Sequence, residues 1–220
     1  MRCVVTAGPT YEPIDKVRRL TNHSTGKLGS NLAKRLVADG HEVILLRGIM
    51  ATHTDPIQEL DMRTFTTTDD LAKKILKIAE ENPKTEAIFH AAAVSDYYVK
   101  SASLKNSDGE LISQKQDKLS TRDGKILLEL HPTKKIIAQL REWFKEAQIF
   151  GWKYEVKGDR VTSINQAKKQ IDENKTNACI INGSAYGDGF GLLKKGSKNT
   201  EHLDNSEMLF NALAQLIKDN

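Results

Sequence analysis

The chain has 220 residues, of which 39% are hydrophobic and 28% charged, and it carries a formal net charge of +4. This apolar content supports a sizeable core and excludes a disordered chain, and the length suits one domain with an appendage. No apolar run approaches the ~18 residues of a membrane span, and the lysine pairs are scattered instead of clustered with arginine and aromatic residues. We therefore expect a cytoplasmic protein whose partners include neither a membrane nor a nucleic acid.

The first half of the chain predicts strands and helices in alternation. β-Branched and apolar runs predict the strands, whereas apolar residues at helical spacing, such as Leu28, Leu32 and Leu36, predict the helices. Gly40 is the expected end of the first helix. The expected elements are strands at residues 2–6, 41–46, 62–65 and 86–92 and helices at residues 26–39 and 71–79.

The second half continues this alternation. A helix is expected over residues 136–147 with Pro132 at its start, and the last helix opens at Asp204 with Glu207 three residues later. The other elements are strands at residues 148–152 and 177–182 and helices at residues 161–174 and 208–217. Six strands alternating with helices predict an α/β fold with a doubly wound, mostly parallel Rossmann-like sheet, in a single domain over residues 1–220.

A polar insertion at residues 97–130 interrupts the alternation. Two Asp-Gly turn signals, Asp108-Gly109 and Asp123-Gly124, predict β-hairpins that project from the sheet. A polar insertion of this length is usually functional or an interaction arm. We expect an inserted hairpin that serves as a dimer arm.

The sheet topology predicts where a ligand would bind. In the common strand order 3-2-1-4-5-6, strands one and four are neighbours at a switch point, and ligands bind beyond the carboxyl ends of the strands there. The loops expected to converge at this point contain Gly8, residues 92–96, Trp152 and Asn182.

Residues 22–29, with the sequence NHSTGKLG, form a polar, glycine-bearing stretch that opens a helix. Backbone N–H groups and the positive end of a helix suit a phosphate, but an ordinary N-cap explains the same residues equally well. The stretch is not a Walker A loop, because Thr21 stands where the first glycine would be, and it lacks the G-x-G-x-x-G pattern.

Three single residues each have two interpretations. Asp96 suits either a hydrated Mg²⁺ or a structural cap, Lys118 either transferred phosphates or solvent, and Trp152 either a nucleobase or the core. The six histidines show no metal-ligand spacing. Cys3 and Cys179 lie in apolar runs, which excludes a disulfide framework and is typical of a reducing compartment.

Taken together, these stretches resemble the phosphopantothenoylcysteine synthetase family. The matching segments are TAGPTYEPID at residues 6–15, VRRLTNHSTGKLG at residues 17–29, AAAVSDY at residues 91–97 and DKL at residues 117–119. Their order and spacing match over nearly the whole chain. The flavin-dependent decarboxylase domain that precedes this one in many bacterial fusions is absent, so the resemblance implies a stand-alone synthetase without flavin.

The resemblance implies a C–N bond-forming ligase of coenzyme A biosynthesis that works as a homodimer with Mg²⁺. The carboxylate of 4'-phosphopantothenate attacks the α-phosphate of a nucleoside triphosphate and releases pyrophosphate. The amine of L-cysteine then displaces the nucleoside monophosphate from the acyl-nucleotide. The task of such an enzyme is charge neutralisation and positioning.

The resemblance also implies roles for residues. Asn22 would contact the pantothenate carboxyl end and serve the second half-reaction, whereas Lys118, with Mg²⁺ held at Asp96, would serve the first. Arg18 would reach the phosphate of the substrate bound by the partner subunit, and Ala92 and Ala93 would hold the pantothenate. The implied nucleotide-binding residues are Gly8, Ser24, Gly26, Lys27, Gly29, Trp152 and Asn182.

Three departures bear on the nucleotide. Many bacterial members have a second lysine where this chain has Ser120, a different sequence at residues 151–156, and an aspartate in place of Gly183. Parts of the chain are closer to the eukaryotic branch, which uses ATP, whereas the bacterial branch uses CTP. We favour CTP, with ATP as the alternative.

Two other classes of function remain open, an NAD(P)-dependent oxidoreductase of Rossmann fold and a non-catalytic nucleotide-binding module. Tyr97 and Lys100 have a Tyr-x-x-Lys spacing, not the Tyr-x-x-x-Lys of short-chain dehydrogenases. Arg47-Gly48, and no acidic residue, ends the second strand. Both observations argue against the oxidoreductase.

Overall fold

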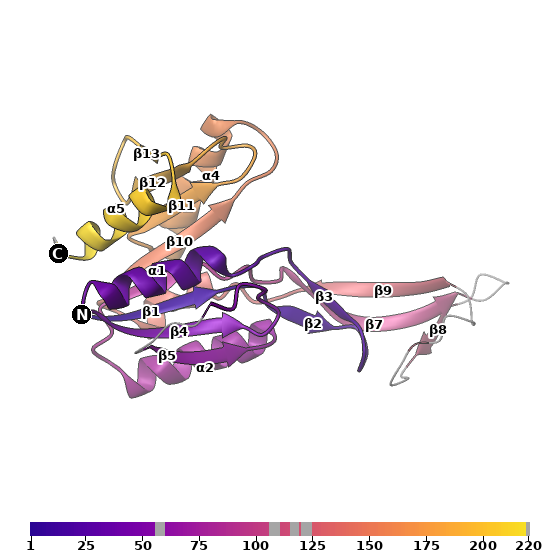
Figure 1. Ribbon diagram of the computed structural model, residues 1–220. Coiled ribbons are helices and arrows are strands. Elements are labelled where there is room, and N and C mark those ends of the chain that lie inside the picture. The colour runs from indigo at the N-terminus through magenta and orange to yellow at the C-terminus, as the bar shows by residue number, and fades with distance from the viewer. Residues whose placement is uncertain (56–59, 106–110, 115–118, 120–124, 219–220) are drawn as a thin grey trace.

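One eight-stranded sheet forms the centre of the molecule (Figure 1). The computed structural model describes residues 1–55, 60–105, 111–114, 119 and 125–218. Six parallel strands follow one another across the sheet as β5 (Asp61–Phe65), β4 (Glu42–Gly48), β1 (Arg2–Ala7), β6 (Ala87–His90), β10 (Gln148–Tyr154) and β11 (Ala178–Asn182). In chain order this is 3-2-1-4-5-6, so the predicted doubly wound, mostly parallel sheet is confirmed.

Two antiparallel strands, β12 (Phe190–Lys194) and β13 (Glu201–Leu203), extend the sheet beyond β11. The sequence analysis did not predict them, because runs of five and three residues offer too few positions to show a period.

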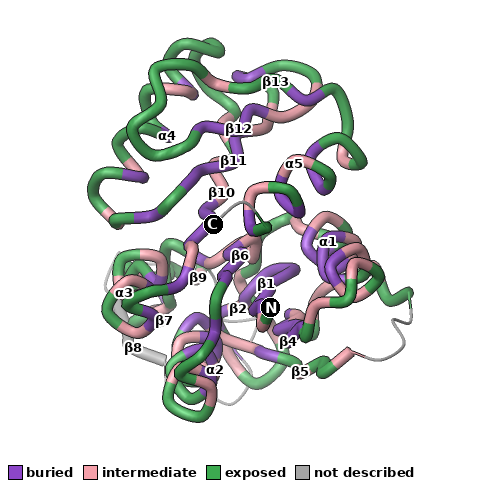
Figure 2. Tube along the Cα trace, turned by 90° about the vertical axis from the view of Figure 1, so that its left-hand side faces the viewer, coloured by how far each residue is buried: buried purple, intermediate pink, exposed green. Residues whose placement is uncertain are grey.

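Helices cover both faces of the sheet (Figures 1 and 2). On one face, α1 (Lys27–Ala38) packs against β1 and β4, and α5 (Ser206–Lys218) packs against β12, β13 and α1, with leucines such as Leu32 and Leu213 buried in one core cluster. On the other, α2 (Thr68–Glu81), α3 (Ile137–Trp143) and α4 (Arg160–Asn174) pack over the remaining side chains. Within the described residues, no helix combines the length and apolarity needed to cross a bilayer.

Two helix boundaries differ from the prediction. The helix expected over residues 136–147 ends at Trp143, because Phe144 adopts φ −125° and ψ 78°, and Pro132 lies in a strand instead of at the helix start. The cap of α5 is Asn205, whose Oδ1 accepts the N–H of Met208 at 3.0 Å, and not Asp204. The predicted Glu207 does lie in the first turn.

Two smaller antiparallel sheets project from the carboxyl ends of the central strands (Figure 1). The first, here called the β2–β3 hairpin, joins β2 (Tyr11–Pro13) to β3 (Arg19–Thr21) and was not predicted. The second, here called the arm, comprises β7 (Tyr97–Lys105), β8 (Leu111–Gln114) and β9 (Lys125–Pro132). The two Asp-Gly turn signals lie outside the described residues.

Candidate active site

The loops after β1 and β6 are joined by a ladder of hydrogen bonds at the predicted switch point. Ala93 N–H donates to the carbonyl of Gly8 at 3.0 Å, and Thr10 N–H donates to the carbonyl of Ala93 at 3.2 Å. The Thr10 hydroxyl accepts the N–H of Ser95 at 2.8 Å. These bonds fix the Ala92-Ala93 segment beside the glycine turn, so two of the predicted sites adjoin.

Asn22 spans the two loops from the end of the β2–β3 hairpin. Its Nδ2 donates to the carbonyl of Val94 at 3.1 Å and to that of Ala93 at 3.4 Å. Because a carbonyl can only accept, the NH₂ group must face both of them. The Asn22 Oδ1 is thereby left as the polar atom that does not face the loop.

Gly26 begins α1 without a side-chain cap of its own, and the hydroxyl of the preceding Thr25 accepts the N–H of Lys27 at 3.2 Å. Gly26 occupies the N-cap position with φ 77°. A Cβ on Gly26 would stand 3.0 Å from the Cβ of Ala51, so the turn packs closely against Ala51. A Cβ on Gly29 would stand 2.7 Å from the Cβ of Ala7, so the helix start lies directly against the end of β1. The next N–H groups of the first turn, those of Leu28 and Gly29, have no side-chain cap among the described residues, and such groups suit an anion. The turn therefore has one side-chain bond, from Thr25, and still leaves backbone donors for a phosphate.

A pocket of about 320 Å³ opens in front of this turn. Predicted residues Asn22 and Ser24 line it together with Met50 and Thr52 of the loop after β4. Sequence reasoning missed the last two, although a loop following a strand next to β1 should reach the same edge. The full lining is Pro9, Thr21, Asn22, His23, Ser24, Thr25, Met50 and Thr52.

His90 ends β6 inside the core, where only 6% of its surface is exposed. Burial lowers its pKa to about 4, so the ring is neutral. The Thr6 hydroxyl accepts the N–H of Ala92 at 3.1 Å, which leaves its proton for Nδ1 of His90, also at 3.1 Å. These two hydrogen bonds, from His90 to Thr6 and from Thr6 to Ala92, anchor the Ala92 backbone to the core.

Arg18 and Asp96 are both paired. Nε and Nη2 of Arg18 lie 2.9 and 2.5 Å from Oδ2 of Asp15, and Asp96 forms an ion pair with Lys135. The side chains of Asp96 and Lys135 are each 65% exposed, so this pair opens readily to a competing cation. Lys118 lies outside the described residues.

Trp152 and Asn182 lie on β10 and β11, away from the residues that line the pocket. Trp152 is partly buried against the core, and its indole Nε1 is buried without a hydrogen-bond partner among the described residues. Gly183 follows with φ 108°, and a Cβ there would stand 2.3 Å from the Glu155 carbonyl oxygen. The close turn explains why this chain has glycine after Asn182.

No group of three His, Cys, Asp or Glu side chains in the described part of the chain is arranged to hold a metal ion. Mg²⁺ is commonly bound by one or two carboxylates together with substrate phosphates. Asp96 is a single carboxylate, so it could hold Mg²⁺ only together with substrate phosphates. Cys3 and Cys179 are both buried and free, and burial raises the pKa of each thiol to about 12.

The fold and the site define a Rossmann-like α/β protein with a pocket at the carboxyl ends of its central strands, next to the switch point of the sheet. The chain belongs to the family described as the DNA/pantothenate metabolism flavoprotein C-terminal domain, whose model matches residues 1–208.

Characterised relatives agree with this assignment. The coenzyme A biosynthesis bifunctional protein CoaBC of Methanocaldococcus jannaschii is 29% identical over 183 residues, which cover 82% of this chain and 40% of that protein. CoaBC of Bacillus subtilis is 30% identical over 185 residues, covering 84% and 42%. The chain thus spans about two fifths of the length of these relatives.

Solved structures share the whole fold. The DNA/pantothenate metabolism flavoprotein from Streptococcus pneumoniae is 26% identical, with a TM-score of 0.82 over 100% of this chain and 99% of that one. A Cab2 mutant in complex with phosphopantothenate-cysteine is 20% identical, with a TM-score of 0.72 over 99% and 87%. The second likeness concerns the fold alone.

Proposed function

We propose that this chain is a phosphopantothenate–cysteine ligase of coenzyme A biosynthesis. It would join 4'-phosphopantothenate to L-cysteine through an acyl-nucleotide, with CTP favoured and ATP as the alternative, as a homodimer in the cytoplasm. Membership of the family and the similarity to the CoaBC proteins support the reaction class. The observation that carries the proposal is the pair of hydrogen bonds from Asn22, which lines the pocket, to the carbonyls of Ala93 and Val94, because they tie two of the matching segments together.

In the first half-reaction, a carboxylate oxygen of the acid bonds to the α-phosphorus, and the bond to the β-phosphate breaks, releasing pyrophosphate. The start of α1, with Ser24 and Lys27, supplies donors and positive charge for the triphosphate. Gly8 and Gly29 allow the loop after β1 and the start of α1 to pack closely against Ala51 and Ala7, which would place both glycines beside the triphosphate. Lys118 would neutralise charge in the same step.

Asp96 would hold Mg²⁺ after exchanging Lys135 for the ion. The ion would supply charge neutralisation on the phosphates.

In the second half-reaction, the cysteine amine bonds to the acyl carbon, the bond to the phosphate oxygen breaks and the nucleoside monophosphate leaves. The amine gives up one proton to solvent. The Nδ2 of Asn22 donates to two backbone carbonyls, so Oδ1 is the atom of this side chain that would accept a hydrogen bond from the attacking amine. Ala92 and Ala93 would hold the acyl chain, and Trp152 and Asn182 would contact the base.

The Asn22→Asp variant tests this proposal. A carboxylate cannot donate to the carbonyls of Ala93 and Val94, so the variant should release pyrophosphate once and accumulate the acyl-nucleotide. Lys118→Gln should block pyrophosphate release itself. The control Asn199→Asp, at an exposed position, should turn over normally. Normal turnover of Asn22→Asp would contradict the assignment.

A binding experiment separates the rival classes. Tight NADH binding with no binding of CTP or ATP would support the oxidoreductase, and nucleotide binding without any acyl-nucleotide would support the non-catalytic module. We expect triphosphate binding and a trapped intermediate.

A further inference from the structure

Asp15, in the turn of the β2–β3 hairpin, is a buried carboxylate that serves no step described so far. Its side chain is only 1% exposed. Its Oδ1 accepts the backbone N–H groups of Val17 at 2.8 Å and Arg18 at 2.7 Å. Its Oδ2 receives Nε and Nη2 of Arg18 and the N–H of Leu119 at 3.1 Å. These bonds occupy both oxygens of the carboxylate.

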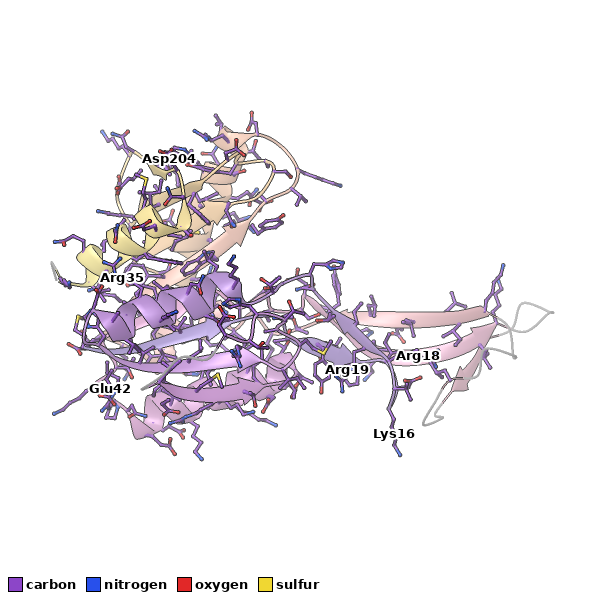
Figure 3. All side chains as sticks on the ribbon, in the orientation of Figure 1. Lys16, Arg18, Arg19, Arg35, Glu42 and Asp204 are labelled. Atoms are coloured by element: carbon purple, nitrogen blue, oxygen red, sulfur yellow. The ribbon has the colours of Figure 1, made fainter. Side chains whose placement is uncertain are left out.

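Leu119 belongs to the insertion, 104 positions away along the chain, and is 4% exposed. Besides donating its N–H to Asp15, it accepts Nη2 of Arg18 on its carbonyl at 2.7 Å. Asp15, Arg18 and Leu119, here called the clamp, therefore form a closed unit. Figure 3 shows Arg18 on the β2–β3 hairpin, where the hairpin lies along the arm.

The clamp uses some of the N–H donors of Arg18 and leaves the others available. A guanidinium has five N–H groups in a planar fork. Nε and Nη2 bond to Asp15 and Leu119, whereas Nη1 has no partner among the described residues. Since the Arg18 side chain is 37% exposed, the Nη1 edge is accessible from outside the clamp.

The ion pair of Asp15 and Arg18 fixes the orientation of the guanidinium but contributes no net charge. The hydrogen bond from Arg18 holds the pKa of Asp15 well below its usual range, and the N–H groups of Leu119 and Val17 act in the same sense. The carboxylate therefore stays ionised and the pair carries no net charge. Arg19 of the same hairpin, 4.3 Å above the ring of Tyr11, adds a positive charge nearby.

We propose that Asp15 is a positioning residue that holds the Arg18 guanidinium with its Nη1 edge toward the phosphate of the acid substrate and fixes the insertion at Leu119. The proposal rests on the proposed function for the identity of the acid and on the role that the family resemblance implies for Arg18, at the phosphate of the substrate bound by the partner subunit. The Nη1 donors bind a phosphate well only when the orientation of the guanidinium is set beforehand. Neither the family motifs nor the pocket assigns a role to Asp15.

The test is discrimination between a phosphorylated and an unphosphorylated acid. Dissociation constants for 4'-phosphopantothenate and pantothenate are measured by calorimetry on the full chain, and amide exchange is followed at Leu119. Asp15→Asn should lower the preference for the phosphorylated acid about 10-fold or more, because it loosens a charge-assisted contact. It should also accelerate exchange at Leu119, and Asp15→Glu should recover part of both.

Asp61→Asn is the matched control. Asp61 forms a similar two-point pair with Arg63, but its side chain is 48% exposed. This variant should leave both the preference and the exchange at Leu119 unchanged.

The outcomes separate cleanly. Faster exchange at Leu119 with an unchanged preference would show that Asp15 is only structural, and unchanged exchange would show that the clamp does not hold; either overturns the proposal. Pyrophosphate release by the unmodified chain is recorded in parallel. If it is absent while Asp15→Asn still lowers the preference, the ligase assignment fails and the positioning role stands.

Discussion

The central sheet and the arm are stabilised in different ways. Every residue of β6 is buried, and Phe89 stacks on Phe150 of β10 with ring centroids 4.6 Å apart. In the arm, β9 is exposed at six of its eight positions, including Leu127, Leu128 and Leu130 at 37–46% exposure. The sheet is stabilised by its own core, whereas the arm has strand pairing but leaves leucines uncovered. This difference supports the proposal that a second copy covers the arm.

The two regions meet at the candidate active site. Thr133, which follows β9, donates its N–H to the carbonyl of Asp96 at 2.9 Å and its hydroxyl to the carbonyl of Ser95 at 2.6 Å. The clamp makes a second tie at Leu119. The position of the arm is therefore coupled to the loop after β6 that would hold the substrate.

The largest expected effect distinguishes the core from the arm. Phe89→Ala removes a fully buried ring and should lower the free energy of unfolding by about 3–5 kcal/mol. Leu127→Ala, at a position 46% exposed in the arm, should change it by less than about 1 kcal/mol. Chemical denaturation measures both. Equal losses would remove the distinction between the two regions.

Charged substitutions in the arm should weaken the association of two copies of this chain. Leu128 and Leu130 lie on one face of β9, so the double variant Leu128→Asp, Leu130→Asp should weaken the proposed dimer about 100-fold, which corresponds to two apolar side chains left in water. Analytical ultracentrifugation measures the dissociation constant. A dimer of unchanged affinity would mean that these leucines are not covered by a second copy.

The buried His90 of the central sheet sharpens the comparison through the pH dependence of stability. Because the folded pKa of buried His90 is about 4, below the unfolded value of about 6.5, the unfolded chain binds the extra proton between these values. Stability is fully present above pH 6.5 and is lost on acidification, by about 2 kcal/mol from pH 7 to pH 5.

The variant His90→Gln should remove this component of the pH dependence. Denaturation midpoints of the unmodified chain and of this variant at pH 5 and pH 7 give the comparison. An equally steep loss of stability in both would show that His90 is not the titrating group.

The smallest expected effect lies at the junction. Thr133→Val removes the bond to Ser95 and should cost about 1 kcal/mol while accelerating amide exchange at the base of β7. Thr176→Val is the control, since the Thr176 hydroxyl is buried without a partner among the described residues. It should be neutral or stabilising. Unchanged amide exchange in β7 after Thr133→Val would show that Thr133 does not couple the arm to the loop after β6.

Local patterns predicted the fold better than the site. The strands and helices followed from β-branched runs and glycine stops such as Gly40, which act over a few residues, and their order in the sheet followed from the common topology of alternating strands and helices. The pocket residues Met50 and Thr52 carry no local signal, because a loop methionine and threonine are common everywhere. The contact between Asp15 and Leu119 joins positions 104 apart and depends on how the insertion folds back. Short strands such as β13 were missed for lack of a period.

Pyrophosphate release in the presence of 4'-phosphopantothenate, with each nucleoside triphosphate in turn, tests the central claim most directly. We predict release that requires the acid, is faster with CTP than with ATP, and is followed by the nucleoside monophosphate only when L-cysteine is added. Release that does not depend on the acid, or none with any triphosphate, would contradict the account.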